Sequence, residues 1–189
     1  MIVAVAALAV PLALFVGASW ITYDESQALY DDRLQRTLDI LYTSARTTFE
    51  TEYLVSTNVA DLVEEYKNAD IPANEAKLHD QLKRLVDALP QVEDVWVLDE
   101  NGVPLVTAKL YPVPKTFTYA DRAYFKALKD GAPRQVSELV HGRIKDIDYF
   151  QYAVRRENAD KSFKGVIAIS ITPAYFNQTF ARAADLPRR

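Results

Sequence analysis

The chain of 189 residues has no cysteine and only two histidines. Without cysteine, neither disulfide bonds nor thiolate metal sites can form. His79 and His141 lie far apart in the sequence, so we expect neither a histidine-based triad nor a metal centre. Lysine and arginine are not clustered and the net charge is −4, which argues against a nucleic-acid partner. We also expect no cofactor.

One group of acid/base side chains remains as an argument for an enzyme. Glu138, His141, Asp146 and Asp148 lie near one another in the sequence. Their spacing matches no catalytic motif, and charged runs of this kind usually form solvated turns. We therefore predict that this chain carries no catalytic residue.

The first 23 residues carry no charged side chain. An apolar run of this length is typical of a transmembrane helix, with Trp20 and Tyr23 as interfacial anchors at its end. A cleaved signal peptide and a buried soluble helix are the alternatives, but the run is longer than a signal-peptide core and no basic segment precedes it. The first basic residue after the span is Arg33, which indicates that this flank lies outside the cytoplasm.

Residues 24–68 contain neither glycine nor proline, and apolar residues recur there at helical spacing. We predict one long signalling helix, or two helices that break near Ser56 and Thr57. Forty residues of helix span about 60 Å, which is more than the width of a small domain. Its first half, Leu34–Ala45, is therefore expected to pair with a second copy as a coiled coil and to form a homodimer.

Residues 69–189 alternate between helical and strand patterns, which predicts an α+β fold with a five-stranded antiparallel sheet. The first expected helix runs from an Asn74 cap to Leu89, and strands Val92–Leu98 and Val103–Ala108 follow around a turn at residues 99–102. A short helix then runs from an Asp121 cap to Lys129 and stops at Gly131. The last expected elements are strands Gln135–Val140, Ile147–Arg155 and Phe163–Thr172 and a helix from Pro173 to about Ala184.

The segment Phe117–Gly131 places one arginine, Arg122, among four aromatic residues. These are Phe117, Tyr119, Tyr124 and Phe125. An aromatic turn of this kind can wall a small pocket and offer the guanidinium to an anionic ligand. The alternative is that the aromatic residues belong to the core and the arginine is a surface charge. The pattern alone favours the core interpretation.

Three segments in this order resemble motifs of one family. Val95–Gly102 is similar to its first hairpin, Asp121–Phe125 to the Asp-Arg-x-aromatic-aromatic helix start beside its ligand, and Phe163–Phe176 to its last strand and closing helix. The family is that of the Cache sensor domains, extracytoplasmic PAS-like domains of bacterial membrane receptors. The resemblance covers nearly everything outside the predicted span, and it is strongest to the sensor domains of histidine kinases.

The resemblance implies a small-molecule site between the sheet and the helix that begins near Arg122. The candidate ligand-binding residues are Arg122, Tyr124, Phe125, Phe117, Tyr119, Tyr111, Tyr149, Tyr152 and Ser170. Strand alternation allows only one of Tyr149 and Tyr152 to face the pocket. The aspartate that commonly holds a ligand amine in this family is replaced by Ser170, and Ala127 stands where another acid is expected. A carboxylate is therefore the favoured ligand class, because an amine would have no ionic partner.

The resemblance implies that this chain is the sensing region of a membrane-bound receptor. The favoured receptor class is a histidine kinase, and we expect its output domain outside this chain. A chemoreceptor or a diguanylate cyclase is the alternative, and so is a ligand-free membrane-anchored domain that only dimerises. We expect the protein in the bacterial inner membrane, with residues 69–189 forming the sensor domain in the periplasm.

Overall fold

The computed structural model describes residues 35–175. The chain falls into two compact units, of which the second spans Arg46–Arg182 and contains the sheet. Of the first unit, residues 35–45 are described, and they are helical. The predicted span at residues 1–23 lies outside the described part. Within residues 35–175, no helix is both long and apolar enough to cross a membrane.

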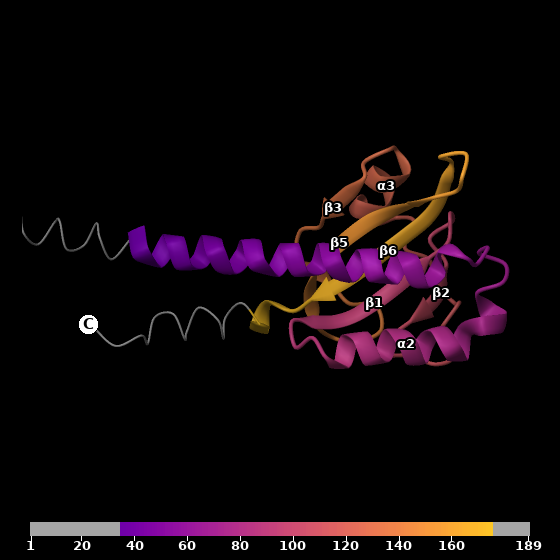
Figure 1. Ribbon diagram of the computed structural model, residues 1–189, viewed down its shortest axis with the longest axis horizontal. Helices are drawn as coiled ribbons and strands as arrows, with labels where there is room; N and C mark the ends of the chain where they lie inside the picture. Colours follow the sequence, from indigo (N-terminus) through magenta and orange to yellow (C-terminus); the bar gives the residue numbers. More distant parts are fainter. Residues whose placement is uncertain (1–34, 176–189) are drawn as a thin grey trace, which may run out of the picture. The chain divides into compact units, whose positions relative to one another are not determined.

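The second unit is an α+β domain, as predicted (Figure 1). After helical residues 46–64 it contains η1 Pro72–Asn74, α2 Glu75–Asp87, β1 Val92–Leu98, β2 Pro104–Thr107, α3 Ala123–Lys129, β3 Arg134–Val136, β4 Val140–His141, β5 Asp148–Glu157 and β6 Phe163–Ile171. The strands pair antiparallel in the order β2-β1-β6-β5-β3, and β4 pairs with β5. The expected five-stranded sheet is therefore present, with the short β4 as an addition.

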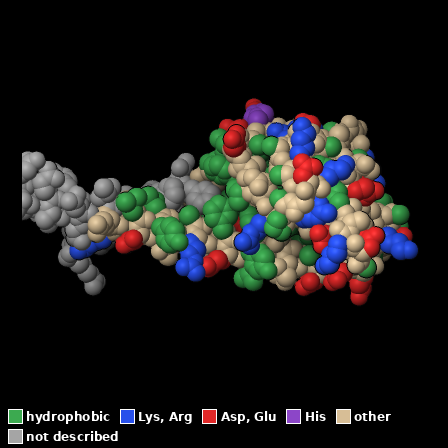
Figure 2. All heavy atoms as spheres, turned by 90° about the horizontal axis from the view of Figure 1, so that it is seen from above, with side chains coloured by type: hydrophobic (Ala, Val, Ile, Leu, Met, Phe, Trp, Pro, Cys, Tyr) green, Lys and Arg blue, Asp and Glu red, His purple; other side chains and the backbone are tan. Residues whose placement is uncertain are grey.

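Charged side chains of both signs are interspersed on the surface that Figure 2 shows. Among the described residues, two ion pairs lie one helical turn apart, Arg46 with Glu50 at 2.8 Å and Lys83 with Asp87 at 2.7 Å. Exposed pairs of this kind contribute about 0.3–0.5 kcal/mol each. The stability of the domain therefore depends on its two apolar cores, one on each face of the sheet.

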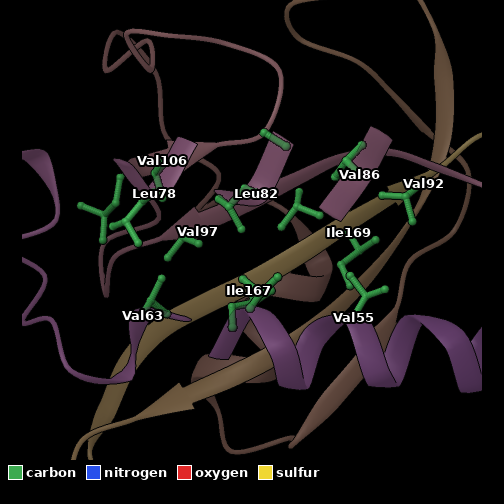
Figure 3. Close-up of a cluster of buried hydrophobic side chains, with 14 of the residues drawn as sticks. Val55, Val63, Leu78, Leu82, Val86, Val92, Val97, Val106, Ile167 and Ile169 are labelled. Carbon is green, nitrogen blue, oxygen red and sulfur yellow. The ribbon is translucent and has the colours of Figure 1, made fainter. Parts of the chain in front are cut away.

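The long helix and α2 cover the first face of the sheet. Val55, Val59 and Val63 follow one another at a spacing of four, so they lie on one side of the helix, and each is at most 3% exposed. They pack with Leu82 of α2 and with Ile167 of β6 in one core (Figure 3). Helical periodicity on one side and strand alternation on the other thus produce the first core. The helix is continuous through residue 56, which agrees with the first of the two predicted alternatives, a single long helix.

The second face of the sheet is covered by α3 and by the loop before it. Tyr124, Phe125 and Leu128 of α3 are at most 4% exposed, and they form a second core with residues of the other side of β6, such as Ala168. Phe125 meets Phe163 edge to face, with ring centroids 5.6 Å apart. The aromatic stretch is therefore largely core, and the central strand β6 is covered on both faces, as its continuous apolar sequence predicted.

Of the two predicted helix caps, one is at the wrong residue and the other is at the right one. Arg122, and not Asp121, occupies the N-cap position of α3, because the Asp121 carboxylate is held by Arg143. Asn74 occupies the N-cap position of α2, as predicted, but its side chain donates to the carbonyl of Asp70 at 3.0 Å and makes no cap bond.

The predicted strand Gln135–Val140 is interrupted and becomes β3 and β4. At the interruption, the hydroxyl oxygen of Ser137 accepts a hydrogen bond from the backbone N–H of Gln151 at 2.9 Å. In a regular antiparallel sheet this backbone N–H of β5 would donate to a backbone carbonyl, and here it donates to a side chain.

Candidate functional site

A cavity of about 40 Å³ lies on the second face of the sheet, beneath the loop that joins β4 to β5. Its lining residues are Glu93, Asp94, Trp96, Leu110, Tyr119, Gly142, Arg143, Ile144, Lys145, Ile147, Tyr149 and Ser170. Residues 142–147, which we call the lid loop, supply five of them. The volume has room for no more than a few water molecules.

Asp94 brings a carboxylate to this cavity from β1, where it is paired in register with Ser170 of β6. Its Oδ1 accepts hydrogen bonds from the Thr107 hydroxyl and from the N–H of Val95, both at 2.7 Å. Burial raises the pKa of Asp94 to about 6, against the lowering effect of these two hydrogen bonds. Both bonds end at Oδ1, which leaves Oδ2 available to a ligand.

Three phenols gather beside this carboxylate. Burial raises the pKa of Tyr119, Tyr124 and Tyr149, so all three keep their protons near neutral pH. Each is close enough to another of them to influence its pKa. Among the described residues, no hydrogen bond involves any of these three hydroxyls. They therefore remain as donors for an oxygen-bearing ligand group.

Two arginines hold the lid loop over the phenols. Arg143 of the loop binds the Asp121 carboxylate and lies over the Tyr119 ring, 5.5 Å from its centroid. Arg122 donates from Nη2 to the carbonyl of His141 at 2.9 Å. The Nε of Arg122 is buried and has no hydrogen-bond partner within the described residues, so it retains one donor on this side of the domain.

The charges of the cavity lining are nearly all paired. Lys145 of the lid loop binds Glu93 at 2.7 Å, and Arg143 is neutralised by Asp121. Asp94 forms no ion pair among the described residues. The charge that remains for a ligand to satisfy is therefore negative, and it calls for a cationic group.

The structure brings some of the predicted ligand residues together. Tyr119, Tyr149 and Ser170 line the cavity. Arg122 and Tyr124 do not line the cavity but are near the phenols that do. The charge of Arg122 lowers the pKa of Tyr119 and Tyr149, and Tyr149 and Tyr119 in turn raise the pKa of Tyr124.

Four other predicted residues do not line the cavity. Phe125 is core, and Phe117 packs edge to face on Tyr119, 5.4 Å between centroids. Tyr111 is 58% exposed, with its ring 5.5 Å from that of His79. Tyr152 belongs to the core on the opposite face of the sheet, as strand alternation requires once Tyr149 faces the cavity.

The sequence indicated no acid at Ser170 or Ala127, and Asp94 of the neighbouring strand, whose carboxylate lines this cavity, was not among the predicted residues. Trp96, Arg143 and Lys145 were also missed. A signal for Asp94 was present in the sequence: Val92–Leu98 is apolar except for Glu93 and Asp94. A buried acid within a strand is rare without a partner or a role.

The acidic segment near His141 is a surface turn. His141 lies 3.2 Å from Asp146 and 3.0 Å from Asp148, and the side chains of all three are more than half exposed. Within residues 35–175, no group of histidine and acidic side chains is arranged to hold a metal ion.

No family model and no curated protein matches the chain. Solved structures do. The extracellular domain of the putative histidine kinase rpHK1S-Z16 is 26% identical, with a TM-score of 0.52, over 76% of this chain and 65% of that one. The sensor domain of the histidine kinase DctB of V. cholerae is 18% identical, with a TM-score of 0.60, over 82% and 60%. The ligand-binding domain of the Campylobacter jejuni chemoreceptor Tlp3 in complex with L-valine is 12% identical, with a TM-score of 0.64, over 82% and 66%.

These neighbours are Cache or PAS-like extracellular sensor domains of histidine kinases and chemoreceptors. The predicted resemblance is therefore confirmed at the level of the fold, and two of the receptor classes that the sequence suggested, histidine kinases and chemoreceptors, are among the neighbours. The neighbouring structures are sensory domains and not catalytic ones. The chain spans 60–66% of the length of these three structures.

Proposed function

We propose that this chain is the ligand-sensing region of a membrane receptor and that its ligand binds in the cavity beneath the lid loop. The observation that carries the proposal is Asp94, a buried carboxylate without an ionic partner among the described residues, in a cavity next to three phenols. Burying an unpaired charge costs several kcal/mol. A fold retains such a charge most readily where a ligand neutralises it.

The ligand class follows from the two sides of the cavity. Asp94 suits a ligand ammonium group, since a charge-assisted hydrogen bond to it contributes about 1.5–3 kcal/mol. The hydroxyls of Tyr119 and Tyr149, with the cation Arg122 nearby, suit a carboxylate. A small amino acid or similar zwitterion meets both requirements, and the Tlp3 neighbour is solved with L-valine. This proposal replaces the simple carboxylate that the sequence favoured.

Ligand entry requires the lid loop to move. Ligand pockets usually enclose about 300–1,000 Å³, far more than the 40 Å³ of the closed cavity. The loop is attached by the Lys145–Glu93 pair, by the Arg143–Asp121 pair and by the hydrogen bond from Arg122. These contacts are polar and partly exposed, so they can break and re-form at low cost.

A thermal-unfolding screen of the full chain against amino acids, amines and carboxylates tests this proposal. We expect a zwitterion to raise the Tm of the wild type, and Asp94→Asn to abolish the rise while the protein still folds. Asp80→Asn on the exposed side of α2 is the matched control and should respond as the wild type does. If every compound class leaves the Tm unchanged, or if Asp94→Asn responds fully, the proposal is wrong.

The wider assignment rests on the same proposal. Residues 1–23 would form the membrane anchor, residues 24–68 the signalling helix through which two copies pair, and residues 69–189 the periplasmic sensor. A histidine kinase is the favoured receptor, because rpHK1S-Z16 and DctB are of that class. Cross-linking of cysteines introduced at positions 38 and 42 tests the dimer, and failure to cross-link in membranes would exclude pairing along that part of the helix.

A further inference from the structure

A second groove lies on the opposite face of the sheet from the sensing cavity. It has a volume of about 360 Å³ and runs between residues 53–64 of the long helix and strands β5 and β6. Its cationic lining residues are Arg155, Arg156 and Lys164, and Arg155 is already paired with Glu157 at 3.0 Å. Since Arg156 shares the helix-facing side of β5 with Tyr152 and Val154, this groove does not communicate with the cavity that contains Asp94.

The guanidinium of Arg156 is buried and incompletely satisfied. The residue is 6% exposed. Its Nη1 donates to Asn68 Oδ1 at 3.1 Å and to the Leu98 carbonyl at 3.3 Å. Its Nη2 is buried and has no acceptor among the described residues. Burial lowers the pKa of Arg156 to about 10. Buried donors almost always have a partner in native proteins, so the Nη2 position points to a missing acceptor.

Lys164 supplies a second cation at the same place. Burial and the charge of Arg156 both lower its pKa, so the two side chains repel each other. The one hydrogen bond of its Nζ is long, 3.5 Å to the carbonyl of Glu64. Neither Arg156 nor Lys164 forms an ion pair within the described residues. Glu100 raises the pKa of Arg156 and Glu64 that of Lys164, but neither carboxylate is in ion-pair contact. Two adjacent cations without a counter-charge in contact are stabilised by an anion that binds between them.

The other groove residues do not supply that anion. Glu157 is already held by Arg155 at 3.0 Å and by Lys161 at 3.7 Å. Asp61 and Glu64 line the groove but are exposed, so water screens their charges, and Glu64 raises the pKa of Lys164 without forming an ion pair with it. The hydroxyls of Ser56 and Thr57 donate to the carbonyl of Tyr53. The donors that remain on the wall therefore belong to the two cations.

We propose that Arg156 and Lys164 form a binding site for a small oxyanion, such as phosphate, sulfate or a carboxylate. The planar fork of Arg156 offers Nη2 to one oxygen, and the ammonium of Lys164 offers a second donor. The bound anion links the long helix to β5 and β6, the elements that form this groove. The site is independent of the sensing cavity and adds a second ligand to the domain.

Titration of the full chain with inorganic phosphate, against chloride at equal ionic strength, tests this site. We expect calorimetry to detect binding and the Tm to rise by about 3–6 °C at ten times the Kd. Lys164→Met should weaken the affinity about 10- to 100-fold through loss of one charge-assisted bond. Lys161→Met, an exposed neighbour, should bind as the wild type does.

Two further variants distinguish this groove from the sensing cavity as the place where phosphate binds. Arg143→Met removes a cation from the sensing cavity and should leave phosphate binding intact. Arg156→Lys keeps the charge without the fork and should weaken binding while circular dichroism shows a folded domain. The proposal is overturned if the wild type shows no phosphate-specific effect, if Lys164→Met binds as tightly as the wild type, or if Arg143→Met alone abolishes binding.

Discussion

Glu52 makes the stability of this domain depend on pH. The side chain lies on the long helix, is fully buried, and has no hydrogen-bond partner among the described residues for either carboxylate oxygen. Burial raises its pKa from 4.5 to about 7. The folded state therefore holds the proton more tightly than the unfolded state does. The contribution of this proton to stability is complete below pH 4.5 and is lost as the pH rises to about 7.

The size of the effect follows from the shift in pKa. Each unit corresponds to about 1.4 kcal/mol, so the full loss is about 3 kcal/mol, most of it between pH 5 and pH 8. Glu52→Gln keeps the shape of the side chain and removes the titration. We expect the free energy of unfolding of this variant to exceed that of the wild type by about 2–3 kcal/mol more at pH 8 than at pH 5.

Urea denaturation at several pH values measures this difference. Asp94 has the same sign, with its pKa raised to about 6, but it titrates in both proteins, so the difference between the wild type and Glu52→Gln isolates Glu52. Glu50→Gln is the matched control, because its carboxylate is exposed and paired with Arg46 at 2.8 Å. That variant should change little with pH. Parallel stability curves for the wild type and Glu52→Gln across pH 5–8 would refute the reasoning.

Two further predictions concern the lid loop and a tight strand contact. In a Trp20→Phe background, Lys145→Gln should raise acrylamide quenching of Trp96, which lines the cavity, by about 1.5- to 5-fold, because a partly exposed ion pair contributes about 0.2–1 kcal/mol to closure. Glu93→Gln should have the same effect and Lys83→Gln none; unchanged quenching in both lid variants would contradict the role of the pair. Gly165→Ala should lower the free energy of unfolding by about 2–5 kcal/mol, since its φ is +133° and a Cβ would lie 2.1 Å from the Leu98 carbonyl. Gly131→Ala, at a φ of +113° with open space around it, should cost only about 1–3 kcal/mol, and equal losses for the two variants would count against the close contact.

The fold was largely predictable because its elements carry regular patterns. Val55, Val59 and Val63 recur at helical spacing, and all three belong to the core between the long helix and the sheet. The bounds of β1, Val92–Leu98, agree with the predicted strand residue for residue. Errors occurred where a side chain replaced a backbone partner, as Ser137 does between β3 and β4. The secondary-structure propensity of the sequence does not indicate where a side chain takes the place of a backbone hydrogen-bond partner.

The candidate site was less predictable because it is assembled from distant segments. Asp94 and Tyr149 share the cavity only because β1 and β5 both neighbour β6 in the sheet. The lid loop was interpreted as a turn, and nothing in its sequence indicates that Arg143 and Lys145 close over that cavity. Arg122 was found from its aromatic neighbours, but its hydrogen bond to the His141 carbonyl depends on the same loop.

The central claim is that Asp94 holds the cationic group of a ligand beneath the lid loop. The most direct measurement is a calorimetric comparison of the best-binding amino acid with its analogue that lacks the amine, on the wild type and on Asp94→Asn. The account predicts that the wild type prefers the amine by about 10- to 100-fold and that Asp94→Asn loses this preference. An equal preference in both proteins, or tighter binding of the analogue to the wild type, would contradict it.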